Sequence, residues 1–130
     1  MSPTFYMNGR GWTVRRVAPN DAALVDRTGA LCLATTDPAT GVVSVSSELS
    51  GSMLSRVLVH EVAHCAMVSY GLLDSLHEWC APGHEVEAEE WACNLLADYG
   101  LTIIRAASSV VGPRAWDYLP REFERVLKAG

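Results

Sequence analysis

The first fifty residues alternate short apolar runs with turn residues, a pattern typical of β-strands. Residues 12–17 are predicted as one strand. Residues 31–35 and Val42–Ser46 flank a loop at 37–41 whose Pro and Gly suit a tight turn, so these two segments are predicted to form a β-hairpin. Valine alternates with serine in its second strand, which predicts one buried and one wetter face.

Apolar residues three and four apart over residues 53–70 predict a largely buried helix. Gly71 is expected to end it, and Ser50 or Ser52 to cap its start. Residues 72–83 are predicted to be irregular, because a Pro-Gly pair breaks the pattern there.

A second helix is predicted over residues 84–99, with four glutamates in its first turns and Gly100 as its end. Residues 101–111 are apolar and predicted to be helical. A last short helix is expected at 120–128, after a loop at 113–117. Strands followed by helices indicate an α+β fold, in which a small, mostly antiparallel sheet packs on the first helix with the glutamate-bearing helix alongside.

The length of 130 residues and the hydrophobic content of 49% fit one domain spanning residues 1–130. The net charge of −5, without a basic cluster, disfavours nucleic acid as a partner. No apolar run is as long as a membrane span, and residues 1–16 do not resemble a signal peptide, so we expect a cytoplasmic protein that does not bind membranes. The oligomeric state stays open.

Four cysteines are spread along the chain without a CxxC pair. This spacing excludes a zinc knuckle or a dithiol redox motif and predicts buried free thiols. They are Cys32, Cys65, Cys80 and Cys93.

The segment His60-Glu61-Val62-Ala63-His64 matches the HExxH pattern. Residues four apart share a helix face, so both imidazoles can reach one metal ion, and Glu61 lies beside them without being a ligand. Zinc lowers the pKa of a bound water toward about 7, and Glu61 can take its proton as general base. The alternative is two histidines with ordinary polar partners, but burying this trio on an apolar helix is otherwise costly.

A catalytic zinc takes a third protein ligand. Glu90 is preferred, because Asn94 follows it by one helical turn and can orient a metal-ligating histidine through a hydrogen bond. Glu89 is the competing ligand. The other downstream candidates are Glu85, Glu87, His77 and His84. Some of these glutamates are expected only to favour the helix start.

His84 is also the candidate donor that would stabilise the oxyanion formed during hydrolysis, because it precedes the glutamate helix at Gly83. The alternative is an ordinary solvated loop histidine.

These motifs resemble the ImmA/IrrE-like zinc metallopeptidases. The matching segments are the HExxH sequence and Glu90-Trp91-Ala92-Cys93-Asn94-Leu95-Leu96-Ala97, within residues 42–100. The sequence that follows, Asp98-Tyr99-Gly100-Leu101, differs from the Leu-Leu-Met-Pro signature of the family, which places the resemblance with a divergent, phage-type branch.

The resemblance implies a minimal zincin-like domain with a Zn²⁺-dependent peptidase activity, directed at a regulatory protein. We therefore expect Zn²⁺ on His60, His64 and Glu90, with a protein or peptide as substrate. The strand Val42–Ser46 is the candidate sheet edge on which such a peptide would lie as an added strand. The alternative function is a catalytically inactive zincin scaffold that binds or regulates a partner.

Overall fold

The computed structural model describes residues 2–112. Contacts between Cα atoms divide the chain into two compact units, Met1–Asp98 and Tyr99–Gly130. All the elements that bear the predicted site residues lie in the first unit or begin there. The expected helix at 120–128 and the loop at 113–117 lie outside the described residues, and the single domain stays a prediction.

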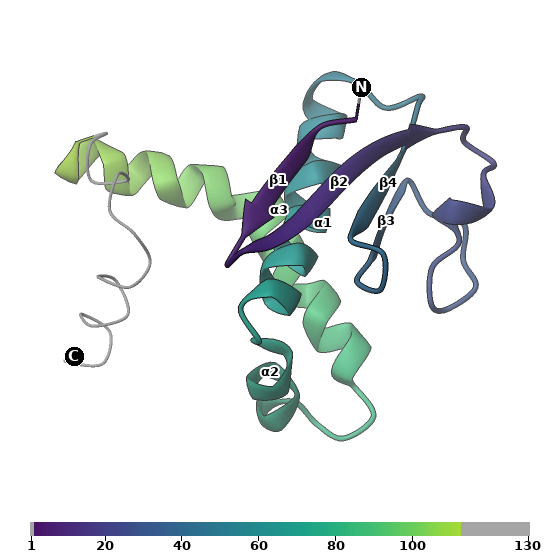
Figure 1. The fold of residues 1–130 in the computed structure, drawn as a ribbon. Coiled ribbons are helices and arrows are strands. Elements are labelled where there is room, and N and C mark those ends of the chain that lie inside the picture. The colour runs from purple at the N-terminus through teal and green to yellow at the C-terminus, as the bar shows by residue number, and fades with distance from the viewer. Residues whose placement is uncertain (1, 113–130) are drawn as a thin grey trace. The chain divides into compact units, whose positions relative to one another are not determined.

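The first unit contains a four-stranded sheet with the order β1-β2-β4-β3. The strands are β1 (Thr4–Met7), β2 (Arg10–Val17), β3 (Ala34–Asp37) and β4 (Val42–Ser46). The pairs β1/β2 and β3/β4 are antiparallel, and β2/β4 is parallel. This mixed, mostly antiparallel sheet packed with helices confirms the predicted α+β class (Figure 1).

Strand β4 has the predicted bounds but a different place in the sheet. It lies between β2 and β3, so its expected role as a sheet edge was wrong, and β3 is the edge instead. On the side away from β3, β4 pairs in parallel with β2, to which a crossover connection joins it. The main-chain groups of β4 are therefore hydrogen-bonded to neighbouring strands on both sides.

The hairpin between β3 and β4 forms as predicted, but β3 begins three residues later than expected. Leu31 pairs instead with Val25 in an isolated bridge, and the amide of Cys32 donates to the carbonyl of Leu24. The turn needs its glycine: Gly41 has a φ of +70°, and a Cβ there would lie 2.9 Å from the carbonyl oxygen of Gly11.

Helix α1 (Gly51–Ser69) carries the HExxH motif, with Ser50 at its N-cap position. Helix α2 (Leu73–Trp79) occupies part of the segment predicted to be irregular. That prediction was wrong because the Pro-Gly pair lies beyond the end of α2 and does not interrupt it.

Helix α3 (Glu85–Val111) begins as predicted, but Gly100 does not end it. A single glycine costs a helix only about 1 kcal/mol and can be tolerated inside it. The helix ends at Gly112, whose φ of +82° is typical of a residue that follows a helix end. Among the described residues, no helix combines the length and apolar character needed to cross a membrane.

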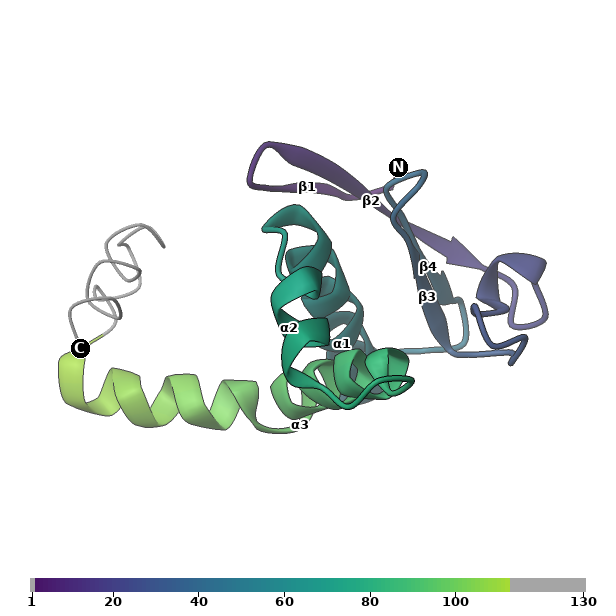
Figure 2. The ribbon, with the colours of Figure 1, turned by 90° about the horizontal axis from the view of Figure 1, so that it is seen from below.

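Helix α1 is buried on two sides, which Figure 2 shows as the strands on one side and α2 on the other. On the sheet side, Val57 and Cys65 join Trp12, Val43 and Val45 in one hydrophobic cluster. On the other side, Ala63 and Met67 pack with Cys93 of α3 and with Leu73 and Leu76 of α2. Of the HExxH side chains, Ala63 therefore packs in the second cluster, and His60, Glu61 and His64 line a cleft.

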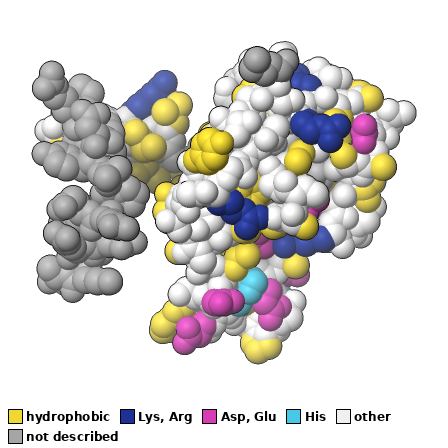
Figure 3. All heavy atoms as spheres, viewed as in Figure 1, with side chains coloured by type: hydrophobic (Ala, Val, Ile, Leu, Met, Phe, Trp, Pro, Cys, Tyr) yellow, Lys and Arg dark blue, Asp and Glu magenta, His cyan; other side chains and the backbone are white. Residues whose placement is uncertain are grey.

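The described surface mixes charges of both signs. On the face seen in Figure 3, acidic and basic side chains of the described residues lie among hydrophobic and uncharged ones. This face carries no continuous basic surface, within the residues described, of the kind that nucleic acid binds.

Candidate metal centre

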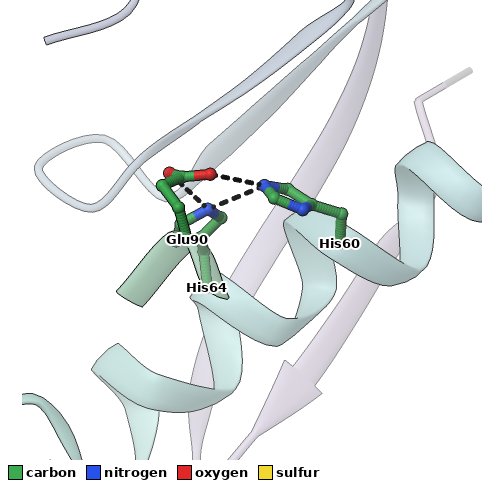
Figure 4. Close-up of side chains that lie close together, drawn as sticks. All are labelled: His60, His64 and Glu90. Atoms are coloured by element: carbon green, nitrogen blue, oxygen red, sulfur yellow. Dashed lines mark hydrogen bonds and ion pairs between the residues drawn. The ribbon is translucent and has the colours of Figure 1, made fainter. Parts of the chain in front are cut away.

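Three side chains from two helices converge next to the sheet. His60 and His64 lie one turn apart on α1, and Glu90 lies in the second turn of α3. Figure 4 shows the Nε2 atoms of both imidazoles pointing toward the Glu90 carboxylate. The ligand atoms of these three residues all lie within 4.8 Å of one another, a grouping that could hold a metal ion.

The distances within this group are short and nearly equal. The two Nε2 atoms are 3.1 Å apart. The carboxylate oxygens of Glu90 lie 3.0 Å from Nε2 of His60 and 3.2 Å from Nε2 of His64. Ligand atoms on a tetrahedral zinc, each about 2.0–2.1 Å from the ion, are about 3.3 Å from each other. These three distances join four atoms, because each histidine faces a different oxygen of Glu90, and all are close to the spacing of ligand atoms on one zinc ion.

Each histidine has a second partner that fixes which nitrogen faces the group. Nδ1 of His60 lies 2.9 Å from Oδ1 of Asn94, and Nδ1 of His64 lies 2.8 Å from Oε1 of Glu89. Both partners accept hydrogen bonds, so each Nδ1 is the donor. Each Nε2 is then free to present a lone pair to a metal ion.

The donor set fits zinc for a chemical reason. Two imidazole lone pairs and a carboxylate that face one another at about 3 Å repel unless a cation lies among them or an imidazole is protonated. Two imidazole nitrogens and one carboxylate oxygen are a ligand set that catalytic zinc uses. The residues present therefore fit the expected ion.

Protonation of His64 competes with a metal. Burial alone would lower the pKa of its imidazole, but hydrogen bonding to Cys93 and Glu89 outweighs burial and raises this pKa to about 10. The pKa of Glu89 is lowered, because its carboxylate accepts from His64 and pairs with Arg27. Glu89 is thus an anion whose charge is shared by two cationic or donor groups.

Glu61 lies on the sheet side of α1 and is only 6% exposed. The hydroxyl of Thr36 on β3 donates a short hydrogen bond to its carboxylate. Glu61 lines the same cleft as the two histidines and Glu90. This carboxylate is therefore anchored beside the candidate metal group and is separate from it.

A cleft of about 690 Å³ opens over this group. Its lining comes from edge strand β3, from α1, from the start of α3, and from the short 3-10 helix η1 (Ala22–Leu24) with the segment that follows it. The cleft is large enough to admit a peptide side chain together with its main chain.

His84 does not join the group. It precedes α3, is exposed, and pairs with Glu87, whose carboxylate raises the pKa of the His84 imidazole. It is absent from the described lining of the cleft. Its role as oxyanion donor stays a prediction that this geometry does not favour.

The other downstream candidates also lie apart from the described metal group. Glu85 accepts a hydrogen bond from the amide of Gly83, which with the helix N-terminus accounts for its place at the start of α3. His77 lies on α2, half-buried. The four cysteines are free thiols, of which Cys65 and Cys93 are buried and Cys32 and Cys80 are half-buried.

The sequence did not predict two residues that touch the site. Arg27 pairs with Glu89 at 2.8 Å, and Thr36 binds Glu61. Both come from segments without a recognisable motif, and Arg27 is 62 residues away from its partner in the chain. No local pattern could have identified either contact.

Comparison with known proteins finds no matching family model, no matching curated protein and no matching solved structure. The resemblance to the ImmA/IrrE-like peptidases thus depends on the two short motifs alone. What the site can do follows from its own side chains.

Proposed function

We propose that this protein is a zinc-dependent metallopeptidase. The observation that carries the proposal is the close approach of both Nε2 atoms and the Glu90 carboxylate, at 3.0–3.2 Å, with the anchored Glu61 carboxylate beside them. A site that only stabilised the fold would have no use for a buried carboxylate next to its ligands. Glu61 is the residue that favours a hydrolase over a structural site.

His60, His64 and Glu90 would hold the ion. Zinc supplies a Lewis acid that polarises a carbonyl and lowers the pKa of a coordinated water to about 7. Glu61 then acts as general base: it takes a proton from the attacking water as the new C–O bond forms. It donates that proton to the amide nitrogen as the C–N bond breaks, so that a carboxylate and an amine leave.

A peptide is the substrate that suits the cleft. Strand β3 is a sheet edge and lines the cleft, so an extended chain can pair with its outer main-chain groups. Such a strand would lie beside Thr36 and hence beside the Glu61 carboxylate. A regulatory protein, as the resemblance implies, is our proposed target.

The test compares the wild type with Glu61→Gln. Glutamine keeps the size of the side chain and can still accept from Thr36, so the variant should fold and bind one zinc per chain, measured by mass spectrometry. Hydrolysis of a quenched fluorescent peptide library by the zinc-loaded protein should fall by at least about a hundredfold, since a general base contributes about 10²–10⁴.

The matched control is Glu78→Gln, an exposed carboxylate on α2 outside the cleft. It should keep full activity. A zinc-loaded wild type that cleaves no member of the library, or a Glu61→Gln variant as active as the wild type, would contradict a peptidase with this base. The first outcome favours the inactive scaffold.

A further inference from the structure

The loop of residues 25–32 is closed on itself by the Asp26 carboxylate. Oδ1 of Asp26 accepts from the amide and hydroxyl of Thr28 and from the amide of Ala30, at 2.6–3.1 Å. The other oxygen, Oδ2, accepts from the thiol of Cys32. These bonds, led by the one from the Thr28 hydroxyl, lower the pKa of Asp26 to about 2. Hydrogen bonds within the loop therefore hold it in a defined conformation.

This loop carries Arg27 to the metal group. Nη2 of Arg27 lies 2.8 Å from Oε2 of Glu89 and 3.6 Å from Oε1 of Glu90. One guanidinium thus touches both neighbouring carboxylates at the start of α3. One of these carboxylates belongs to the candidate ligand set, and the other holds His64.

Glu89 connects Arg27 to His64. Its side chain is only 6% exposed, with one oxygen on Nδ1 of His64 and the other on Arg27. A buried carboxylate is stable only when its oxygens are paired, and an Arg is well suited to hold one in a fixed orientation. Without Arg27, one oxygen of Glu89 loses its partner, and the carboxylate can rotate away from the imidazole.

We infer that Arg27 is a positioning residue of the metal centre: it fixes Glu89, which in turn orients His64 so that Nε2 faces the ion. The inference goes beyond the proposed peptidase activity, because it concerns metal affinity alone. It extends the metal centre to the loop of residues 25–32, which also lines the cleft.

Charge alone and the proposed role of Arg27 predict opposite effects of its removal on zinc affinity, so the experiment can distinguish them. Removing a positive charge near a dication should, by Coulomb's law alone, tighten zinc binding. If Arg27 acts through Glu89, its removal weakens zinc binding instead. Loss of an outer partner of a metal-binding histidine costs about 10–100-fold in affinity.

The experiment measures zinc affinity by competition with a chromophoric chelator, for the wild type, Arg27→Gln and Arg27→Lys. Arg27→Gln should bind zinc at least about tenfold more weakly. Arg27→Lys should lie between the two, because an ammonium can still pair with Glu89. In a Glu89→Gln background, Arg27→Gln should have little further effect, since residues that act as one unit are not additive.

Arg56→Gln is the matched control. Arg56 lines the same cleft, is similarly exposed, and forms a 2.7 Å ion pair, but with Asp98. Its loss should leave zinc affinity unchanged or slightly tighter. Circular dichroism and thermal unfolding in EDTA check that each variant folds.

Arg27→Gln with wild-type or tighter affinity would overturn the inference. If Arg27→Gln does not fold, Arg27→Lys decides: an affinity below that of the wild type supports the proposal, and an equal affinity overturns it. A wild type that binds zinc without cleaving peptides contradicts the proposed activity and leaves this result standing. A wild type that takes up no zinc contradicts both.

Discussion

Replacing Glu90 by Gln should remove most of the stability that zinc gives the protein. The carboxylate of Glu90 lies 3.0 and 3.2 Å from the two Nε2 atoms and supplies the negative charge within the candidate ligand set. A neutral amide is a much poorer zinc ligand, so we expect at least about a hundredfold weaker binding, the upper end of what the loss of an outer partner costs. Glu89→Gln, which changes only an outer partner, should lose about tenfold.

These losses translate into unfolding temperatures. At free zinc about 1,000 times the wild-type Kd, binding stabilises the native state by about 4 kcal/mol. A tenfold weaker site leaves about 2.7 kcal/mol, and a hundredfold weaker site about 1.4 kcal/mol. At about 4 °C per kcal/mol for a domain of this size, zinc should raise the Tm by about 16 °C in the wild type, 11 °C in Glu89→Gln and 6 °C in Glu90→Gln.

The assay is thermal unfolding with zinc and with EDTA, each variant being compared with its own EDTA sample. That comparison removes the effect that breaking the Arg27 pair has on the metal-free fold. Glu78→Gln should show the wild-type shift. If zinc stabilises Glu90→Gln as much as the wild type, or if Glu89→Gln loses more of the zinc-dependent shift than Glu90→Gln, then Glu90 is not the ligand.

Two further predictions concern pH and thiol reactivity. The pKa of His64 is raised from 6.5 to about 10, so the stability that its protonation gives the metal-free protein should be complete below pH 6.5 and be lost as pH rises toward 10. Unfolding in EDTA at pH 6, 8 and 10 measures this trend, and His64→Gln should flatten it. A trend of opposite sign would refute the assignment. Burial raises the pKa of the Cys65 thiol to about 12 and that of the Cys32 thiol to about 11, so both thiols should react slowly with iodoacetamide at neutral pH. Mass spectrometry of the native protein should find Cys65 unmodified. Rapid alkylation of Cys65 would contradict its burial.

Local patterns predicted much of the helical half of the site. The HExxH spacing requires only that residues 60–64 be helical, and the Asn94 amide one turn after Glu90 identifies the carboxylate that meets both histidines. Both inferences depend on distances along one helix, which sequence spacing determines directly.

The strands show where local patterns end. Hairpins were predictable from turn residues, and Asn8-Gly9, with positive φ at both residues, is the signal that indicates the β1–β2 hairpin, which was missed. The parallel pairing of β2 with β4 joins segments far apart in the chain, and no turn specifies it. Because β2 pairs with β4, β4 lies inside the sheet and β3 lies at its edge.

The contacts of Arg27 and Thr36 were unpredictable for the same reason. Each depends on where a loop or a strand comes to lie against a helix, which is a property of the whole packed unit. Gly100 was misleading in another way. A glycine that follows a helical pattern often ends it, but the helix continues where the following residues also favour a helix.

The two buried sides of α1 have a consequence for how the site can respond to its surroundings. The ligand side depends on the approach of α1 to α3, whereas the Glu61 carboxylate depends on Thr36 of β3. The base and the third ligand are therefore held by different parts of the fold, since a strand of the sheet holds the Glu61 carboxylate and α3 supplies Glu90. A change at Thr36 should disturb the base first, whereas a change in the packing of α3 on α1 should disturb the ligands first.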